Sequence, residues 1–261
     1  MFTAPTIRVE LMRFINERRF NRRLVPFTSN VSYHQFKRVF NDRHIARLLN
    51  APASTNISTI LLYGFSPEQT SHIVMMNRLH KFTYFATESK DIEIFFRTNL
   101  LQQTHNFTIH VGSPDVLPFK ERFFDAVITG DPQLYLRNYD QLTACSADSA
   151  PCLSLVDGDE NLKEIHSVIL PIQHHVKVKR SKHEILPDHI IDITQKYEWK
   201  TEITFADIQS YLAFLFSLPM FDSLSLEEHF EHTYETLSGL YEGKDTITVT
   251  VHFHADEFLL S

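Results

Sequence analysis

Short apolar runs alternate with amphipathic stretches along the middle of the chain. The apolar runs are typical of strands, and the first is typical of a strand that is covered on both faces. They occupy residues 58–63, 82–86, 107–111 and 124–129. Helical patterns at residues 67–79 and 90–101 separate the first three runs. Helices between strands at this spacing predict parallel strands that are joined by right-handed crossovers.

Two helices are expected ahead of this alternation, over residues 5–25 and 32–49. Each carries apolar side chains at helical spacing. These are Ile7, Leu11, Phe14 and Ile15 in the first, and Phe36, Val39, Phe40, Ile45 and Leu48 in the second. A polar stretch at residues 50–57 then marks the best domain boundary. We therefore expect an N-terminal helical cap over residues 1–50 and an α/β domain over residues 51–261.

The pattern beyond residue 130 is less regular. We expect strands at 150–156 and 246–253, the latter with strict period-two alternation. Two strand-like segments, 190–197 and 198–204, surround a predicted turn. An insert is expected around residues 172–205. The remaining helices are predicted at 132–142, 161–169, 206–215 and 224–241. Thr204 is the predicted cap of the helix at 206–215, and Asp207 lies in its first turn.

Composition and charge narrow the class of protein. The 261 residues are 43% hydrophobic and 22% charged, as in an ordinary globular protein, and the net charge is −7. An acidic chain argues against broad nucleic-acid binding. The N-terminal stretch is nevertheless basic, from Arg18 to Arg47. We interpret it as a solvated helix face, with a binding face for an acidic partner as the alternative.

Cysteine use and hydropathy point to the cytoplasm. Cys145 and Cys152 are too few for a disulfide framework or a four-ligand zinc site. No signal-peptide pattern opens the chain, and no apolar run is long enough to span a membrane. We expect a cytoplasmic protein with free thiols and no membrane contact.

The most specific motif runs from residue 110 to 128 (HVGSPDVLPFKERFFDAVI). A strand is followed by Gly112, then by Leu-Pro-Phe at 117–119, a polar loop, and Phe-Asp-Ala-Val at 124–127. This order resembles the core of class I (Rossmann-like) S-adenosylmethionine-dependent methyltransferases. Ser113 departs from that family, which often has an acid there. The resemblance implies an α/β fold with a doubly wound, mostly parallel, seven-stranded-type sheet behind an N-terminal helical segment.

The stretch TILLYGFSPEQ resembles the family's first strand and glycine loop. Gly64 matches the first glycine, whereas Ser66 and Glu68 stand where the second and third would be. Glu88 falls where an acidic residue binds the ribose. The resemblance implies an S-adenosylmethionine site that is formed by Tyr63, Gly64, Phe65, Ser66, Glu88, Ser113, Pro114 and Thr129. It identifies no catalytic residue.

Each of these positions also has a structural interpretation. Gly64 permits close approach of backbone to a ligand, or simply a tight turn. Glu88 can accept hydrogen bonds from a ribose diol, or stabilise a helix N-terminus. Ser113 could offer a hydroxyl near the adenine, and Phe65 or Val116 could cover its ring. In a parallel sheet all of these groups come to the carboxyl ends of the strands, where ligands bind.

The His252-x-His254-x-Asp256 pattern places two imidazoles on one face of a strand. Such a pattern can hold a metal when a further ligand joins it. No companion motif is visible, and we expect no metal.

Two hypotheses for function remain open. The first is an S-adenosylmethionine-dependent methyltransferase that acts on a small molecule, with Tyr135, His110, Asp131 and Trp199 as candidates to line the substrate site. The second is a non-catalytic scaffold or regulatory partner subunit of the same fold, because side chains crowd the glycine loop and weaken cofactor binding. The methyl acceptor and the oligomeric state are not indicated by the sequence.

Overall fold

A computed structural model describes most of the chain. It covers residues 1–20, 33–50, 57–86, 106–113, 115–131, 137–166, 193–218 and 228–260. The predicted helix at 90–101, Glu88, Pro114 and Tyr135 lie outside these residues, as do residues 172–192 of the predicted insert.

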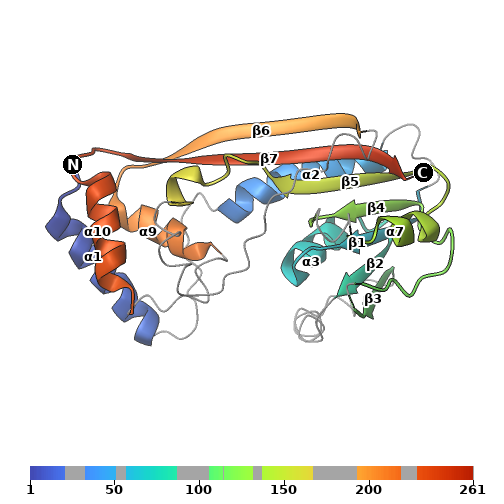
Figure 1. Cartoon of the computed structure of the whole chain (residues 1–261), viewed down its shortest axis with the longest axis horizontal. Coiled ribbons are helices and arrows are strands. Elements are labelled where there is room, and N and C mark those ends of the chain that lie inside the picture. The colour runs from blue at the N-terminus through green and yellow to red at the C-terminus, as the bar shows by residue number, and fades with distance from the viewer. Residues whose placement is uncertain are drawn as a thin grey trace. The chain divides into compact units, whose positions relative to one another are not determined.

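Seven strands form one sheet in the order β3-β2-β1-β4-β5-β7-β6 (Figure 1). They are β1 (Thr59–Tyr63), β2 (Lys81–Ala86), β3 (Phe107–Val111), β4 (Ala126–Thr129), β5 (Ala150–Asp157), β6 (Ile193–Phe205) and β7 (Ile247–Leu260). The strands β1 to β5 pair in parallel, and β7 pairs with β5 in the antiparallel sense. This confirms the predicted mostly parallel α/β sheet, whose order reverses between β1 and β4.

The helices are α1 (Ala4–Phe20), α2 (Tyr33–Asn50), α3 (Pro67–Met76), α7 (Tyr139–Cys145), α9 (Ile208–Ser217) and α10 (Phe230–Tyr241). The predicted apolar face of α1 is confirmed, because Ile7, Leu11, Phe14 and Ile15 are all buried. In α2 the prediction is wrong for Val39, which is 63% exposed. Val39 precedes the buried Phe40, so the two side chains point about 100° apart around the helix.

Three further predictions are corrected in the later chain. Asp207, not Thr204, caps α9, and its side chain accepts a hydrogen bond from the Ser210 amide at 2.7 Å. Residues 193–205 of the predicted insert form a single strand, β6, without the predicted turn at residue 197. β7 continues seven residues past the predicted end at Phe253, because residues 253–260 pair with β5.

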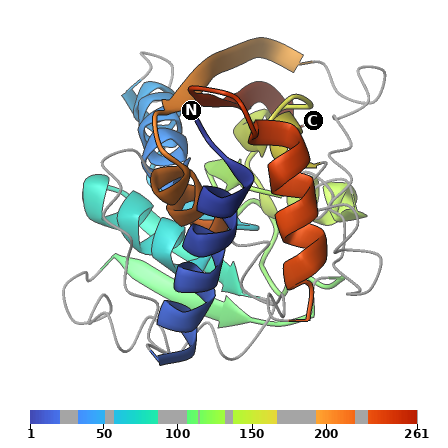
Figure 2. The same cartoon turned by 90° about the vertical axis from the view of Figure 1, so that its left-hand side faces the viewer.

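The chain divides into two compact units, which do not follow the order of the sequence. The described parts of the first are residues 1–20, 33–37, 159–166, 200–218 and 228–252. Within it α1 packs against α9 and α10, as Figure 2 shows. Arg8 of α1 joins Glu231 of α10 at 2.8 Å, and its guanidinium lies 4.8 Å from the centre of the Tyr234 ring.

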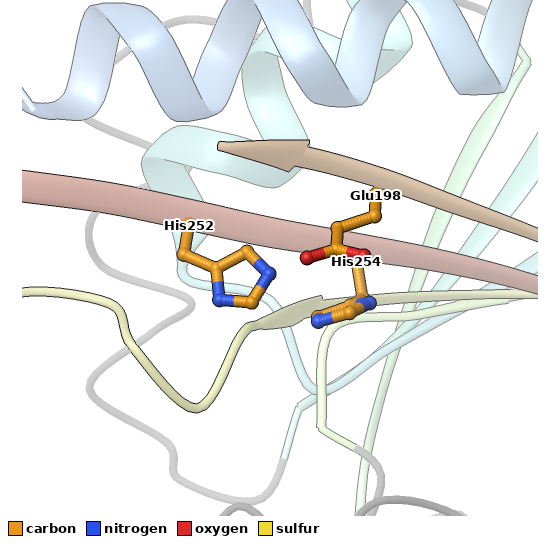
Figure 3. A group of neighbouring side chains, drawn as sticks. All are labelled: Glu198, His252 and His254. Atoms are coloured by element: carbon orange, nitrogen blue, oxygen red, sulfur yellow. The ribbon is translucent and has the colours of Figure 1, made fainter. Parts of the chain in front are cut away.

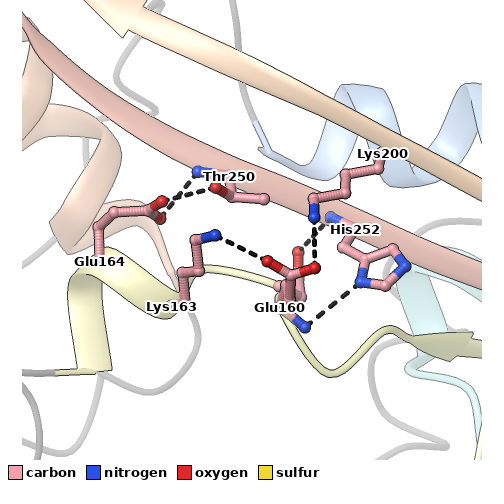
Figure 4. Close-up of polar contacts among 7 residues, drawn as sticks. Glu160, Lys163, Glu164, Lys200, Thr250 and His252 are labelled. Carbon is pink, nitrogen blue, oxygen red and sulfur yellow. Dashed lines mark hydrogen bonds and ion pairs between the residues drawn. The ribbon is translucent and has the colours of Figure 1, made fainter.

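A polar network ties the segment after β5 to the strands of this first unit (Figure 4). The Glu164 carboxylate accepts hydrogen bonds from the amide and hydroxyl of Thr250, at 2.9 and 2.5 Å. Glu160 contacts both Lys163 and Lys200. These bonds to the Lys163 and Lys200 side chains lower the pKa of Glu160 to about 2. The segment after β5 is therefore held by these polar contacts together with the burial of Leu162 and Ile165.

The second unit holds β1 to β5, α3, α7 and most of α2. It also holds residues 193–199 of β6 and residues 253–260 of β7. A cluster of buried side chains lines one side of its sheet, including Tyr63, Phe85, Phe124 and Cys152. Elsewhere in this unit Trp199 of β6 stacks on Phe253 of β7 and on Phe40 of α2, with ring centres 5.8 and 6.4 Å apart. Trp199, a predicted substrate-site residue, therefore belongs to an aromatic packing group.

The predicted domain boundary at residue 50 stays a prediction. No helix among the described residues is both long and apolar enough to cross a membrane. Both cysteines are free and buried.

Candidate functional site

The carboxyl ends of β1 and β4 meet at the point where the strand order reverses. Gly64 follows β1 with φ of 75°, a conformation that L side chains rarely adopt. A Cβ atom on Gly64 would lie 2.6 Å from the Asp131 Cβ and 2.8 Å from the Asp131 amide nitrogen. The Gly130 amide also donates to the Tyr63 carbonyl at 2.9 Å. Glycine is thus required at position 64, because the loop after β1 presses against the end of β4.

Phe65 packs on the other side of this contact. Its side chain is only 6% exposed, and a Cβ on Gly130 would come within 2.8 Å of its ring. The Tyr84 hydroxyl donates to the Phe65 carbonyl at 2.8 Å. Phe65 therefore fills the space beside β4 with its own ring, and Val116, which is 59% exposed, is the better candidate to cover a ligand.

Ser66 closes the loop through a capping box at the start of α3. The Ser66 amide donates to the Gln69 side-chain oxygen at 3.0 Å, and the Ser66 hydroxyl accepts from the Gln69 amide at 3.3 Å. Pro67 follows and carries no amide hydrogen. A glycine loop presents its amides to a ligand, whereas this loop uses the Ser66 amide within the chain.

Tyr63, the last residue of β1, lies inside the second unit. Its side chain is fully buried, and its hydroxyl oxygen accepts a hydrogen bond from the Asn138 amide group at 2.9 Å. Burial, together with the charge of Asp131, raises the pKa of Tyr63 to about 12. The phenol is therefore neutral at physiological pH and serves as a hydrogen-bonding group.

Thr129 ends β4 and positions Asp131. The Thr129 hydroxyl donates to the Asp131 carbonyl at 3.1 Å and accepts from the Asp131 amide at 3.2 Å. Thr129 is completely buried, whereas Asp131 is half-buried. The Asp131 carboxylate therefore brings a negative charge to the edge at which Gly64 sits.

Ser113 lies at the end of β3 and is exposed. Its hydroxyl accepts a hydrogen bond from the Asp115 amide at 3.3 Å. The same loop is held from α7, because Gln141 accepts from the Leu117 amide and donates to the Asp115 carbonyl, each at 2.8 Å. The strand-end residues Gly64, Asp131 and Ser113 thus belong to three loops that are each fixed by side-chain hydrogen bonds.

Sequence reasoning missed the residues that fix this edge. Asn138, Gln141, Tyr84 and Gln69 hold it through side-chain hydrogen bonds. Only Gln69 carried a signal, because Ser66 and Gln69 match the spacing of a capping box. Asn138 and Gln141 are far from Tyr63 and Leu117 in sequence, so no local pattern relates them.

The motif at residues 110–128 is mainly structural. Phe119 packs edge-on against Phe85, His110 and Phe124, with ring centres 4.9 to 5.9 Å apart. His110 is thereby engaged in aromatic packing. The Asp125 carboxylate accepts hydrogen bonds from the Ser58 amide and hydroxyl and from the Thr59 amide, at 2.8 to 2.9 Å. Asp125 thus secures the start of β1, at the edge of the sheet opposite to the candidate site.

The histidines of β7 form a separate group with a carboxylate. Glu198, His252 and His254 each offer one ligand atom, and these atoms lie within 4.8 Å of one another (Figure 3). However, the His252 Nδ1 atom accepts a hydrogen bond from the Glu160 amide at 3.3 Å. A neutral imidazole that accepts at Nδ1 carries its proton on Nε2, whereas metal-bound histidines donate through their second nitrogen. This geometry does not favour a metal, and the expectation of none stays a prediction.

The chain was compared with known proteins by sequence and by structure. No family model and no curated protein matches it in sequence. In structure it is similar to a presumed methyltransferase from Bacillus halodurans C-125, at 10% identity and a TM-score of 0.54, over 83% of this chain and 98% of that one.

Two further solved structures give a consistent result. The MccD protein matches at 10% identity and a TM-score of 0.54, over 84% of this chain and 97% of that one. A geranyl diphosphate methyltransferase in complex with S-adenosylmethionine matches at 10% identity and a TM-score of 0.50, over 87% of each chain. The chain therefore has the fold of the class I S-adenosylmethionine-dependent methyltransferases.

Proposed function

We propose that this protein is an S-adenosylmethionine-dependent methyltransferase-like protein that acts on a small molecule. The observation that carries the proposal is the junction of β1 and β4, where Gly64 presses against Asp131 at the reversal of strand order. Ligands of doubly wound sheets bind at this reversal, beyond the carboxyl ends of the strands. The solved structure of a geranyl diphosphate methyltransferase supports both the cofactor and the class of substrate.

The residues at this edge fit the cofactor in part. The Asp131 carboxylate suits a cationic group, and the exposed Ser113 hydroxyl suits a polar edge such as that of adenine. Glu88 and Pro114 complete the set that the family resemblance implies. Two features oppose cofactor binding. Phe65 is packed onto Gly130, and the Ser66 amide already donates to the Gln69 side chain. We therefore infer that the cofactor, which would supply the methyl group, binds in the high micromolar range or weaker, on the order of −5 kcal/mol.

A calorimetric titration with S-adenosylmethionine and S-adenosylhomocysteine tests this proposal. Weak but saturable binding is expected. The Asp131→Asn variant should bind S-adenosylmethionine about tenfold more weakly or worse, because a charged partner is worth about 1.5–3 kcal/mol. Asp148→Asn removes the same charge from an exposed surface position and should bind like the wild type. Equal affinities of the two variants would contradict the role of Asp131.

A non-catalytic scaffold or regulatory subunit is the second candidate. The observation that favours it is the closed hydrogen bonding of the loop after β1, through Ser66, Gln69 and Tyr84. No detectable binding of either ligand, at concentrations well above the expected dissociation constant, would favour the scaffold over the enzyme.

A further inference from the structure

The strand β6 is the outermost strand at one end of the sheet. It is 13 residues long and lies beside β7, as Figure 1 shows. Thr194 bonds to Glu257 and Thr204 lies beside Thr248, so the two strands run antiparallel. Among the described strands, none pairs with the far side of β6. An outermost strand presents its main-chain donors and acceptors to any further strand that fits.

The charged side chains of β6 alternate in sign along one face. Lys196, Glu198, Lys200 and Glu202 occupy every second position, and all four are exposed. Since side chains of a strand alternate between its faces, the four charges share one face. The opposite face is apolar at its centre, where Trp199 stacks on Phe40 and Phe253.

We propose that β6 pairs with β6 of a second copy of this chain, in the antiparallel sense, on a twofold axis through Trp199. In this register Lys196 stands opposite Glu202 of the second copy, and Glu198 stands opposite its Lys200. The twofold axis repeats both pairs, so four cross-strand pairs of opposite charge form on one face. Such pairs stabilise neighbouring strands, whereas like charges that face each other destabilise them.

The same sequence excludes the neighbouring registers. A shift by two residues in one direction sets Lys196 against Lys200 and Glu198 against Glu198. A shift in the other direction sets Glu198 against Glu202 and Lys200 against Lys200. A shift by one residue would place the charged face of one copy beside the apolar face of the other. The alternation therefore favours one register, with four pairs of opposite charge, over its nearest neighbours.

The contact between Lys200 and Glu160 is compatible with this pairing. Both side chains are more than 40% exposed, and an ammonium group has three donors. Lys200 can thus bond to Glu160 of its own chain and to a carboxylate of the second copy. One pair of strands buries less surface than the interface of an obligate dimer, so we expect a dimer that dissociates at micromolar concentrations.

Sedimentation velocity over a concentration series tests the proposal with two charge-reversed variants. Lys196→Glu with Lys200→Glu carries only negative charges on the face, and Glu198→Lys with Glu202→Lys carries only positive ones. Each variant should sediment as a monomer where the wild type is a dimer. An equimolar mixture of the two variants should dimerise again, because all four cross-strand pairs are then restored.

Two controls keep the test decisive. Lys81→Glu with Lys120→Glu makes the same change of charge at exposed positions of β2 and of the loop before β4, and should dimerise like the wild type. The wild type itself should dissociate further as salt is raised, because exposed ion pairs are screened. A monomeric wild type, a dimer that salt does not weaken, or a mixture that fails to associate would each overturn the proposal.

Discussion

A single carboxylate, that of Asp125, secures the start of the central strand. It accepts three hydrogen bonds, from the Ser58 amide and hydroxyl and from the Thr59 amide. Partial burial by itself raises the pKa of a carboxyl group, but these bonds to Ser58 and Thr59 outweigh it, so the pKa of Asp125 lies below its ordinary value. Stability from this group is therefore present above the unfolded-state pKa, and it is lost as the pH falls through the folded-state pKa.

Replacement of Asp125 by Asn should destabilise the protein by about 1–3 kcal/mol near neutral pH, the range for lost hydrogen bonds to a charged group. The difference should begin to shrink below about pH 4, where the carboxyl group is protonated in the unfolded chain, and it should disappear once the pH is below the lowered folded-state pKa. Urea denaturation at the two pH values measures both effects.

The matched control for Asp125 is Asp148→Asn, whose carboxylate meets Arg122 while 77% exposed. Exposed ion pairs contribute about 0–1 kcal/mol, so this variant should be nearly as stable as the wild type. If the two substitutions cost the same free energy, Asp125 does not hold β1 in the way described.

At the scale of elements, the loop between β1 and α3 determines how well a cofactor can bind. Replacing Ser66 and Glu68 together by Gly removes one partner of the capping box and two Cβ atoms. We expect the double variant to bind S-adenosylmethionine about tenfold more tightly, equivalent to about 1.4 kcal/mol. The helix should lose about 1 kcal/mol of stability, mainly through glycine in its first turn.

Calorimetry on the double variant and on Glu121→Gly, which removes one exposed charge outside the loop, checks this expectation. Binding that is no tighter in the double variant would mean that Phe65, not the capping box, limits access.

Elements with a strong local pattern were predictable from the sequence, and those stabilised by distant partners were not. The run at residues 107–111 coincides with β3, because its alternating apolar side chains by themselves indicate a strand, although only Phe107 of them is buried. The continuation of β7 past Phe253 was missed, since His254, Asp256 and Glu257 interrupt the apolar pattern. Their strand conformation depends on pairing with β5, which no local signal reports.

The candidate site was predictable only in its backbone. Gly64 is needed where the family resemblance placed the first glycine, because Asp131 leaves no room for a Cβ. The positions of Tyr63 and Phe65 within the core follow from tertiary packing, which depends on Asn138, Tyr84 and Gly130. Such contacts join residues that are far apart in the sequence.

At the scale of the whole molecule, the sheet order and the structural matches agree on one fold, and the chain departs from that fold mainly in its use of glycine. The protein has six glycines, of which Gly64 and Gly130 face each other at the reversal of strand order. Side chains stand where the family has its other loop glycines. The architecture is thus retained while the loop amides are partly bonded within the chain.

The two buried thiols can report how often the core around the sheet opens. Cys152 is completely buried in β5, where burial raises the pKa of its thiol, and burial likewise raises the pKa of Cys145 to about 11. Because the thiolate is the reactive form, both side chains should be inert towards alkylating reagents while the sheet is intact. Modification must wait for an opening event, so its rate in native buffer should report how often the sheet opens. Rapid labelling of Cys152, at the rate of an exposed thiol, would show that β5 is far less protected than its packing implies.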